Sequence, residues 1–253
     1  MKLTFLGTGT STGVPTVGCS CPVCASEDPR DHRTRPSLKL DFDGRTILID
    51  TAPDFRAQAL RERIERVDAI LFTHAHADHV LGLDDVRPYY FRQNQPIPIY
   101  ADDRTMDTLE RIFQYIFDGK YPYGGILRVE PHRIPGPVEL WGVVFTPLPV
   151  LHGNLPILGF RFGSVAYVTD FSELPESTLA LMEGLDTLIL SALRPKPHPA
   201  HSTVAHSLSV VERLKPRRAF FTHIAHEISH QATEAELPPN VRIAYDGLAL
   251  EWD

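Results

Sequence analysis

The sequence has few cysteines, no long apolar run and no excess of basic residues. Its 253 residues include only three cysteines, too few for the disulfide framework of a small secreted domain. No apolar run reaches the 18 or so residues of a membrane-spanning helix. The apolar stretch at the N-terminus is too short for a secretory signal. We therefore expect a cytoplasmic protein with no membrane partner.

The charge balance weighs against a nucleic-acid partner. Lys and Arg number 25 against 32 Asp and Glu, which gives a formal net charge of −7. A protein that binds a phosphate backbone needs clustered Lys and Arg, and we find no long basic insertion. A small phosphorylated substrate held by metal ions stays compatible with this charge, because a bound cation reverses the local field.

What the sequence does contain is an alternation of apolar strands with amphipathic helices. Asp43-Gly44 between two apolar segments is a strong hairpin signal. The spacing of apolar residues predicts helices over residues 103–117 and 203–214, and residues 241–252 are expected to form a closing hairpin. Both halves of the chain begin with hairpins and continue with helix–strand pairs, which predicts an α/β fold of two sheets with helices outside.

Three imidazoles and one carboxylate directly follow a predicted buried strand at residues 69–73. They are His74, His76, Asp78 and His79. Neutral imidazole binds zinc, iron or manganese, and carboxylate suits harder cations. Four such groups within six positions, at a strand-to-helix turn, can converge on two cations.

Three further candidates lie at the ends of predicted strands. They are His152, Asp170 and His223. In open α/β folds the carboxyl ends of the strands open onto one rim, where ligands bind. Together with the histidine motif, these residues complete a set of seven potential metal ligands.

The three cysteines are the second candidate metal site. Cys19, Cys21 and Cys24 supply most of a tetrahedral zinc site, but no fourth ligand lies nearby in the sequence. Buried cysteines without a metal are the alternative. A redox switch is less favoured, since nothing marks one cysteine as an activated thiolate.

The motif His-x-His-x-Asp-His, followed by an isolated His, a strand-terminal Asp and a late His, resembles the metallo-β-lactamase-fold hydrolases. The resemblance covers nearly the whole chain and implies a single domain over residues 1–253, a four-layer αββα sandwich. It also implies an active site with two divalent metal ions, zinc or manganese. One metal would be bound by His74, His76 and His152, the other by Asp78, His79 and His223, with Asp170 bridging them.

Within these hydrolases, the chain is similar to the subgroup of the phosphoribosyl cyclic phosphate phosphodiesterase of phosphonate breakdown. The features that carry this resemblance are Cys-x-Cys-x-x-Cys near the start, Thr-His-x-x-His at the late ligand and Tyr-Asp-Gly at the end. The resemblance implies a structural zinc ion bound by Cys19, Cys21, Cys24 and His226. It also implies catalytic roles for Asp78 and for His201, which would act as general acid or contact the phosphate.

The predicted reaction is hydrolysis of a small, cyclic or linear, phosphate diester. Two cations about 3.5–4 Å apart lower the pKa of a bridging water toward roughly 7, and His201 would supply a proton to the leaving alkoxide. Asp50, at a strand end, is expected to accept a hydrogen bond from a ligand imidazole. Asp246 is expected to do the same, with a plain Asp-Gly turn as the alternative.

Three other functions stay open. A thioesterase or lactonase would use the same metals to polarise a carbonyl. An RNA-processing nuclease is less favoured because the net charge is negative. A non-catalytic metal-binding protein is less favoured because the set of potential metal ligands is complete. The sequence also leaves open the natural ester, the metal pair and a homodimer. It does not assign Arg56, His230 or the aromatic loop at residues 121–125, whereas His32, His132, His198 and His206 are expected at the surface.

Overall fold

Two mixed sheets carry the strands of this protein in a computed structural model that describes residues 1–120 and 124–252. Each sheet belongs to its own compact unit. Unit 1 comprises Met1–Gly7, Arg35–Pro135 and Gly247–Asp253, and unit 2 comprises Thr8–Thr34 and Gly136–Asp246. Tyr121 to Tyr123, part of the loop for which no role was predicted, lie outside the described residues.

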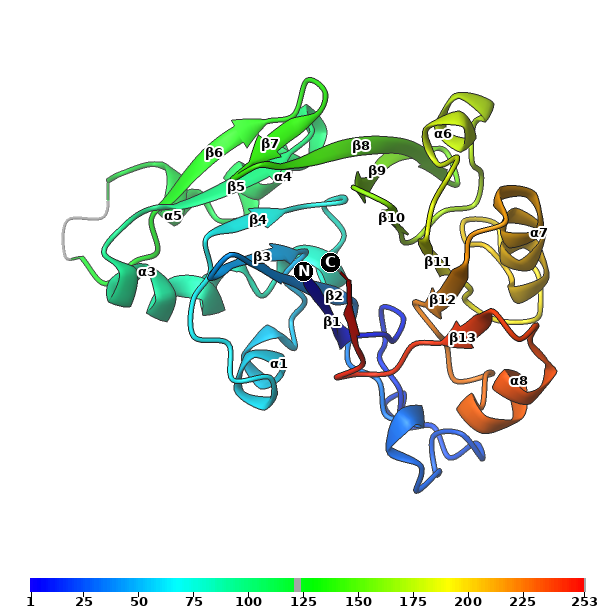
Figure 1. Cartoon of the computed structure of the whole chain (residues 1–253). Coiled ribbons are helices and arrows are strands. Elements are labelled where there is room, and N and C mark those ends of the chain that lie inside the picture. The colour runs from blue at the N-terminus through cyan, green and yellow to red at the C-terminus, as the bar shows by residue number, and fades with distance from the viewer. Residues whose placement is uncertain (121–123, 253) are drawn as a thin grey trace. The chain divides into compact units, whose positions relative to one another are not determined.

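The sheet of unit 1 has the strand order β14-β1-β2-β3-β4-β5-β6 (Figure 1). Its strands are β1 (Lys2–Gly7), β2 (Ser37–Phe42), β3 (Arg45–Ile49), β4 (Ala69–Leu71), β5 (Ile97–Ala101), β6 (Val129–Arg133) and β14 (Ala249–Glu251). From β14 to β3 neighbouring strands are antiparallel, and from β3 to β6 they are parallel. The predicted hairpin turn between β2 and β3 is present, with Asp43 and Gly44 at φ of 48° and 72°, as a type I′ turn requires.

Short helices connect the parallel strands of unit 1. They are α1 (Phe55–Arg61), α2 (Ala77–Val80), the 3₁₀ helix η2 (Leu83–Val86), α3 (Arg87–Gln93), α4 (Asp103–Ile112) and α5 (Gln114–Phe117). The helix predicted over residues 103–117 is thus divided at Phe113, whose φ and ψ of −108° and 37° leave the helical region. Its apolar stripe still joins the core, which Met106, Leu109 and Ile116 share with buried residues of the sheet.

The sheet of unit 2 has the order β13-β12-β11-β10-β9-β8-β7. Its strands are β7 (Val138–Leu140), β8 (Val143–His152), β9 (Leu155–Phe162), β10 (Val165–Val168), β11 (Thr187–Ser191), β12 (Arg218–Thr222) and β13 (Val241–Ile243). The strands from β7 to β10 are antiparallel, and those from β10 to β13 are parallel. Figure 1 shows the helices α6 (Glu176–Leu181), α7 (Val204–Leu214) and α8 (His230–Glu236) along this sheet.

In the C-terminal half, the predicted helix over residues 203–214 is present, whereas the predicted hairpin over residues 241–252 is not. Helix α7 has the predicted extent, with Thr203 as its N-cap, because the Thr203 hydroxyl accepts a hydrogen bond from the backbone N–H of His206. The predicted hairpin over residues 241–252 is wrong, since β13 pairs with β12 in unit 2 and β14 pairs with β1 in unit 1. The α/β class itself, with two mixed sheets and connecting helices, is confirmed. Among the described residues, no helix has the length and apolarity that crossing a membrane requires.

Candidate metal centres

The histidine motif of unit 1 spans the turn after β4 and the short helix α2, which contains Asp78 and His79. His74 and His79 are buried, with ring centroids 4.1 Å apart, and the ring of His76 lies 4.6 Å from that of His74. A carboxylate oxygen of Asp78 lies 3.4 Å from Nε2 of His79. Two ligand atoms at about 2 Å from one metal ion are separated by about 3 Å, so this pair has the spacing of two ligands of one ion.

Asp50 anchors this motif from the end of the neighbouring strand. Nδ1 of His79 donates to a carboxylate oxygen of Asp50 at 2.7 Å, and Asp50 also accepts bonds from the backbone N–H and the hydroxyl of Thr73, both at 2.8 Å. With the proton on Nδ1, the lone pair of His79 is on Nε2, the nitrogen that faces Asp78. Burial raises the pKa of Asp50, and His79 and Thr73 act in the opposite direction.

The Asp50–His79 contact makes a testable prediction. Asp50→Asn keeps the size of the side chain but loses the charge that orients the imidazole, and we expect about 10–100-fold weaker binding of an active-site metal. Titration of metal-free protein with zinc or manganese measures this. Asp68→Asn is the matched control, because Asp68 is also buried in unit 1 but accepts from Thr46 and Arg66 and not from an imidazole. Equal affinities in both variants would contradict the role of Asp50.

In unit 2, the predicted ligands lie at strand ends. Asp170 follows β10, His223 follows β12 and His152 ends β8. All three are buried, and Nε2 of His223 lies 3.1 Å from a carboxylate oxygen of Asp170. Nδ1 of His152 donates to the backbone carbonyl of Ala200 at 2.6 Å, which leaves Nε2 of His152 to bind a metal. Unit 2 therefore brings together an aspartate and two imidazoles, a donor set that fits a divalent cation.

The ring of His201 contacts those of two of these predicted ligands. Its centroid is 4.5 Å from that of His152 and 5.1 Å from that of His223, and it is 4.8 Å from that of His198. Burial first, and the neighbouring His223 second, lower the pKa of His201 to about 3. Without a bound anion, the ring of His201 is thus neutral at pH 7. The ring of His201 therefore contacts two of the predicted ligands, and its role in a site stays a prediction.

Three of the predicted site residues have a strained backbone. Asp50, Asp170 and His223 have positive φ values of 63°, 53° and 57°. The left-handed region is unfavourable for side chains other than glycine and is concentrated at functional sites. In all three cases a strand ends just before the strained residue, so the backbone turns at the end of that strand.

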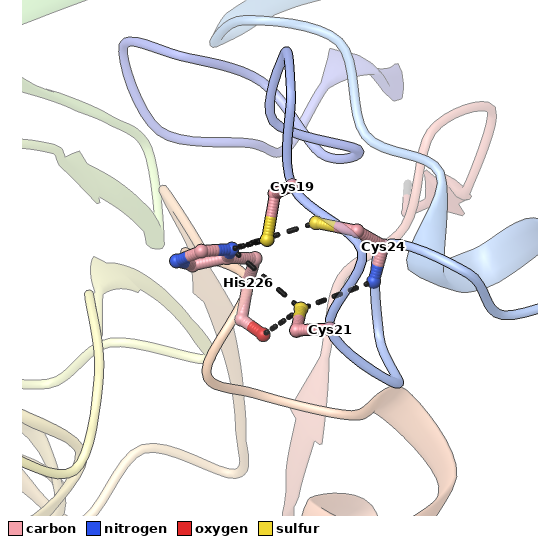
Figure 2. Close-up of side chains that lie close together, drawn as sticks. All are labelled: Cys19, Cys21, Cys24 and His226. Carbon is pink, nitrogen blue, oxygen red and sulfur yellow. Dashed lines mark hydrogen bonds between the residues drawn. The ribbon is translucent and has the colours of Figure 1, made fainter.

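The three cysteines and His226 form a second cluster, within unit 2. Figure 2 shows the side chains of Cys19, Cys21 and Cys24 around the imidazole of His226. The three sulfur atoms lie 3.2, 3.7 and 3.4 Å from Nδ1 of His226, and the four ligand atoms all lie within 4.8 Å of one another. Ligands of a tetrahedral zinc ion, at about 2.0–2.3 Å from the metal, are about 3.3–3.8 Å apart. This cluster fits a zinc ion.

Two thiols of the cluster, those of Cys21 and Cys24, differ in pKa and therefore in how readily they form the thiolate that binds a metal. The backbone N–H of Cys24 donates to Sγ of Cys21 and lowers the pKa of Cys21 to about 7. Burial raises the pKa of Cys24 to about 11. Because the thiolate is the form that binds a metal, Cys21 is the more readily available ligand at neutral pH, and a metal charge is needed to deprotonate Cys24.

Three further residues that the sequence analysis named are Asp246, His230 and Arg56. Asp246 accepts hydrogen bonds from the backbone N–H and hydroxyl groups of Thr8 and Thr34, so it joins two N-terminal segments of unit 2; a bond with a ligand imidazole stays a prediction. His230 is buried between Arg33 and Glu234, which supports a structural role. Arg56 lines a surface cavity of 660 Å³ in unit 1.

Sequence reasoning missed two residues of the candidate site. His198 was expected at the surface, but its ring contacts that of His201. The spacing of these two histidines, three positions apart in a proline-rich loop, was the available signal. Thr73 was read as the end of a strand, and its hydroxyl contacts both Asp50 and Nδ1 of His74. No sequence pattern identifies such a hydroxyl.

Comparison with known proteins places the chain in a family. Residues 45–224, more than half of the chain, match the beta-lactamase superfamily domain. The chain belongs to this superfamily. A crystal structure of a diphosphatase of the PhnP family is 50% identical to it, with a TM-score of 0.94, and the match covers 100% of this chain and 98% of the other. The predicted fold class, the metallo-β-lactamase type, is confirmed, and so is the resemblance to a hydrolase of the PhnP family.

Two further relatives extend the comparison. Zn²⁺-bound PqqB from Methylobacterium extorquens has the same fold at 20% identity, with a TM-score of 0.80 over 100% of both chains. An octanoyltransferase of Porphyromonas gingivalis is 38% identical over 98% of this chain. The match covers 51% of that protein, so the chain spans about half the length of this relative.

Proposed function

We propose that the protein hydrolyses a P–O bond in a small phosphate compound. The observation that carries this proposal is the position of His201, in contact with His152 and His223. A histidine beside the metal ligands can donate a hydrogen bond or a proton to an anionic phosphoryl group. In thioester or lactone hydrolysis, the oxyanion formed from the carbonyl would be held by the two metal ions and would have less need of a histidine donor. The 50% identity with a diphosphatase along the whole chain supports the same class of substrate.

We propose that the chain acts as one catalytic domain, with seven protein ligands for the active-site metals. The proposed ligands are His74, His76, Asp78, His79, His152, Asp170 and His223. The chemistry supplied there by two divalent cations, zinc or manganese, would be a lower pKa of water, toward about 7, and an offset of negative charge on the phosphoryl group. Asp50 would hold His79 in the tautomer that presents Nε2, and Ala200 would do the same for His152.

His201 would act on the phosphate side of the reaction. Its low pKa in the metal-free protein means that it enters the site as a neutral ring with one N–H donor. A bound phosphate carries negative charge, and a nearby opposite charge favours the protonated imidazolium. We propose that His201 takes up a proton from solvent as the phosphate compound binds, donates a hydrogen bond to a phosphate oxygen, and then passes that proton to the leaving oxygen and returns to the neutral ring.

Two kinds of P–O bond suit this arrangement. The phosphodiesterase subgroup that the sequence resembles implies a diester with an alkoxide leaving group. The diphosphatase with 50% identity favours a diphosphate, in which the leaving group is itself a phosphate. Both reactions need a nucleophilic water, a cation at the phosphoryl oxygens and a proton for the leaving oxygen, so the same residues serve either substrate.

The Cys19, Cys21, Cys24 and His226 cluster would hold a structural zinc ion, separate from the reaction. Four protein ligands complete a tetrahedral shell and leave no position for substrate. The ion would join an N-terminal segment to a residue more than 200 positions later, and a link across so long a loop stabilises the folded chain.

The test is a substrate panel with protein reconstituted separately with zinc and manganese. It contains bis(p-nitrophenyl) phosphate, a nucleoside diphosphate, a thioester, a lactone and a short RNA. Turnover of either phosphate compound, lost on chelation and restored by metal, is the expected result. Turnover confined to the thioester or the lactone would overturn the proposal, and RNA cleavage alone would move the protein to the nucleases.

A further inference from the structure

The loop that carries His198 and His201 is stabilised by one arginine at its base. This loop, residues 194–201, contains three prolines, which have no N–H to donate, so it forms neither helix nor strand. Nε of Arg194 donates to the carbonyl of Lys196 at 3.3 Å, and a terminal nitrogen donates to the carbonyl of Pro197 at 3.2 Å. One guanidinium thus bonds two successive carbonyls on the N-terminal side of His198.

The other terminal nitrogen of Arg194 contacts the residue after His226. It lies 3.3 Å from a carboxylate oxygen of Glu227, and the other oxygen of Glu227 lies 3.8 Å from Nε2 of His226. In addition, the backbone N–H of Ala225 donates to the carbonyl of Leu193 at 2.9 Å. The segment that brings His226 to the three cysteines therefore also holds the start of the loop.

The far end of the loop contacts the candidate active site. The carbonyl of Ala200 accepts from Nδ1 of His152, and the ring of His201 contacts those of His152 and His223. The loop is closed behind His201, where the backbone N–H of Leu193 donates to the carbonyl of Ser202 at 3.0 Å. A shift of the loop would therefore move His201. It would also break the hydrogen bond from Nδ1 of His152 to the carbonyl of Ala200, which holds His152 in one tautomer.

We propose that Arg194 and Glu227 are positioning residues, which fix the His201 loop relative to the Cys/His cluster. This inference rests on the proposed function for its effect on turnover. An exposed ion pair alone contributes little to stability, and both side chains are partly exposed. The planar guanidinium of Arg194 donates to two carbonyls and one carboxylate at the same time. A lysine has a single charged nitrogen and cannot make these three bonds in the same geometry.

Kinetics on bis(p-nitrophenyl) phosphate and histidine-ring NMR of the full-length protein test this proposal together. We expect Arg194→Ala to lower kcat by about 10–100-fold with little change in KM, since a misplacement of about 1 Å has an effect of that size. Arg194→Lys should show a similar loss, and Glu227→Gln, which keeps an acceptor oxygen, a smaller one. Arg213→Ala is the matched control, because Arg213 bonds Glu176 on the surface of the same unit and contacts none of these residues.

The NMR signals of His198 and His201 separate this inference from the proposed function. They should move in Arg194→Ala and in Cys21→Ser but not in Arg213→Ala, whichever substrate the enzyme uses. If phosphate compounds are not hydrolysed, the proposed function fails and the signals alone decide the positioning role. The positioning role would be overturned if Arg194→Ala and Arg213→Ala had the same kcat and the same histidine NMR signals. Signals unmoved in Cys21→Ser would overturn the link to the cluster, and should Arg194→Ala not fold, Arg194→Lys and Glu227→Gln give the same readings.

Discussion

His201→Ala is expected to lower the turnover of a phosphate substrate by about 10²–10⁴-fold, the usual size of a lost acid–base contribution, with the metal content unchanged. The physical reason is that His201 contacts the rings of two proposed ligands but is not itself a proposed ligand. An alanine in its place leaves the metal site intact and removes the N–H donor. Steady-state kinetics and metal analysis on the same preparation measure both quantities.

His206→Ala is the control for this experiment. His206 lies in the first turn of α7, five residues after His201, but its side chain is exposed and its ring lies against Phe171. It should keep both activity and metal. If His201→Ala loses metal and turnover in equal proportion, the residue is structural and the proposed proton transfer is wrong.

Cys21→Ser is expected to remove about one zinc ion per chain and to lower the free energy of unfolding by about 3–5 kcal/mol, the effect of losing a link across a long loop. For a chain of this size that corresponds to a fall in Tm on the order of 10 °C. The two active-site metals should stay, since the cysteine cluster shares no residue with the proposed active-site ligands. Metal analysis and thermal unfolding, with and without added zinc, provide the measurements.

Ser20→Ala is the matched control, because Ser20 lies in the same loop between two of the cysteines and is exposed. It should change neither Tm nor the zinc content. A Cys21→Ser protein with the parent's metal stoichiometry would show that the three thiols and His226 are held together without zinc.

Local signals in the sequence predicted the local structure well. The Asp43-Gly44 turn follows from the backbone preferences of two residues, and α7 begins at a threonine N-cap because Thr203 supplies the hydroxyl that the first turn needs. The histidine motif could be found for a similar reason, since its members lie within six positions and chain geometry alone keeps them close.

Contacts between distant segments were much harder to predict. The end of the chain has the apolar alternation of a hairpin, yet β13 and β14 join different sheets, because the backbone of β13 pairs in parallel with β12 and that of β14 pairs antiparallel with β1. Asp50 was expected to accept from a ligand imidazole, and its contact with His79, 29 positions later, depends on β3 and β4 lying side by side. His198 was assigned to the surface although its spacing of three positions from His201 was visible in the sequence, because only the fold brings the two rings into contact.

The amino-acid sequence was sufficient to establish the α/β class, the hydrolase superfamily and the residue types of both candidate metal centres, since these depend on short-range patterns and ligand chemistry. The folded structure was needed to bring His226 to the cysteines, to bring His201 into contact with His152 and His223 and to reveal Arg194 at the base of the His201 loop. Those contacts depend on the packing of strands and loops that lie far apart in the chain, and that packing has no short-range signature in the sequence.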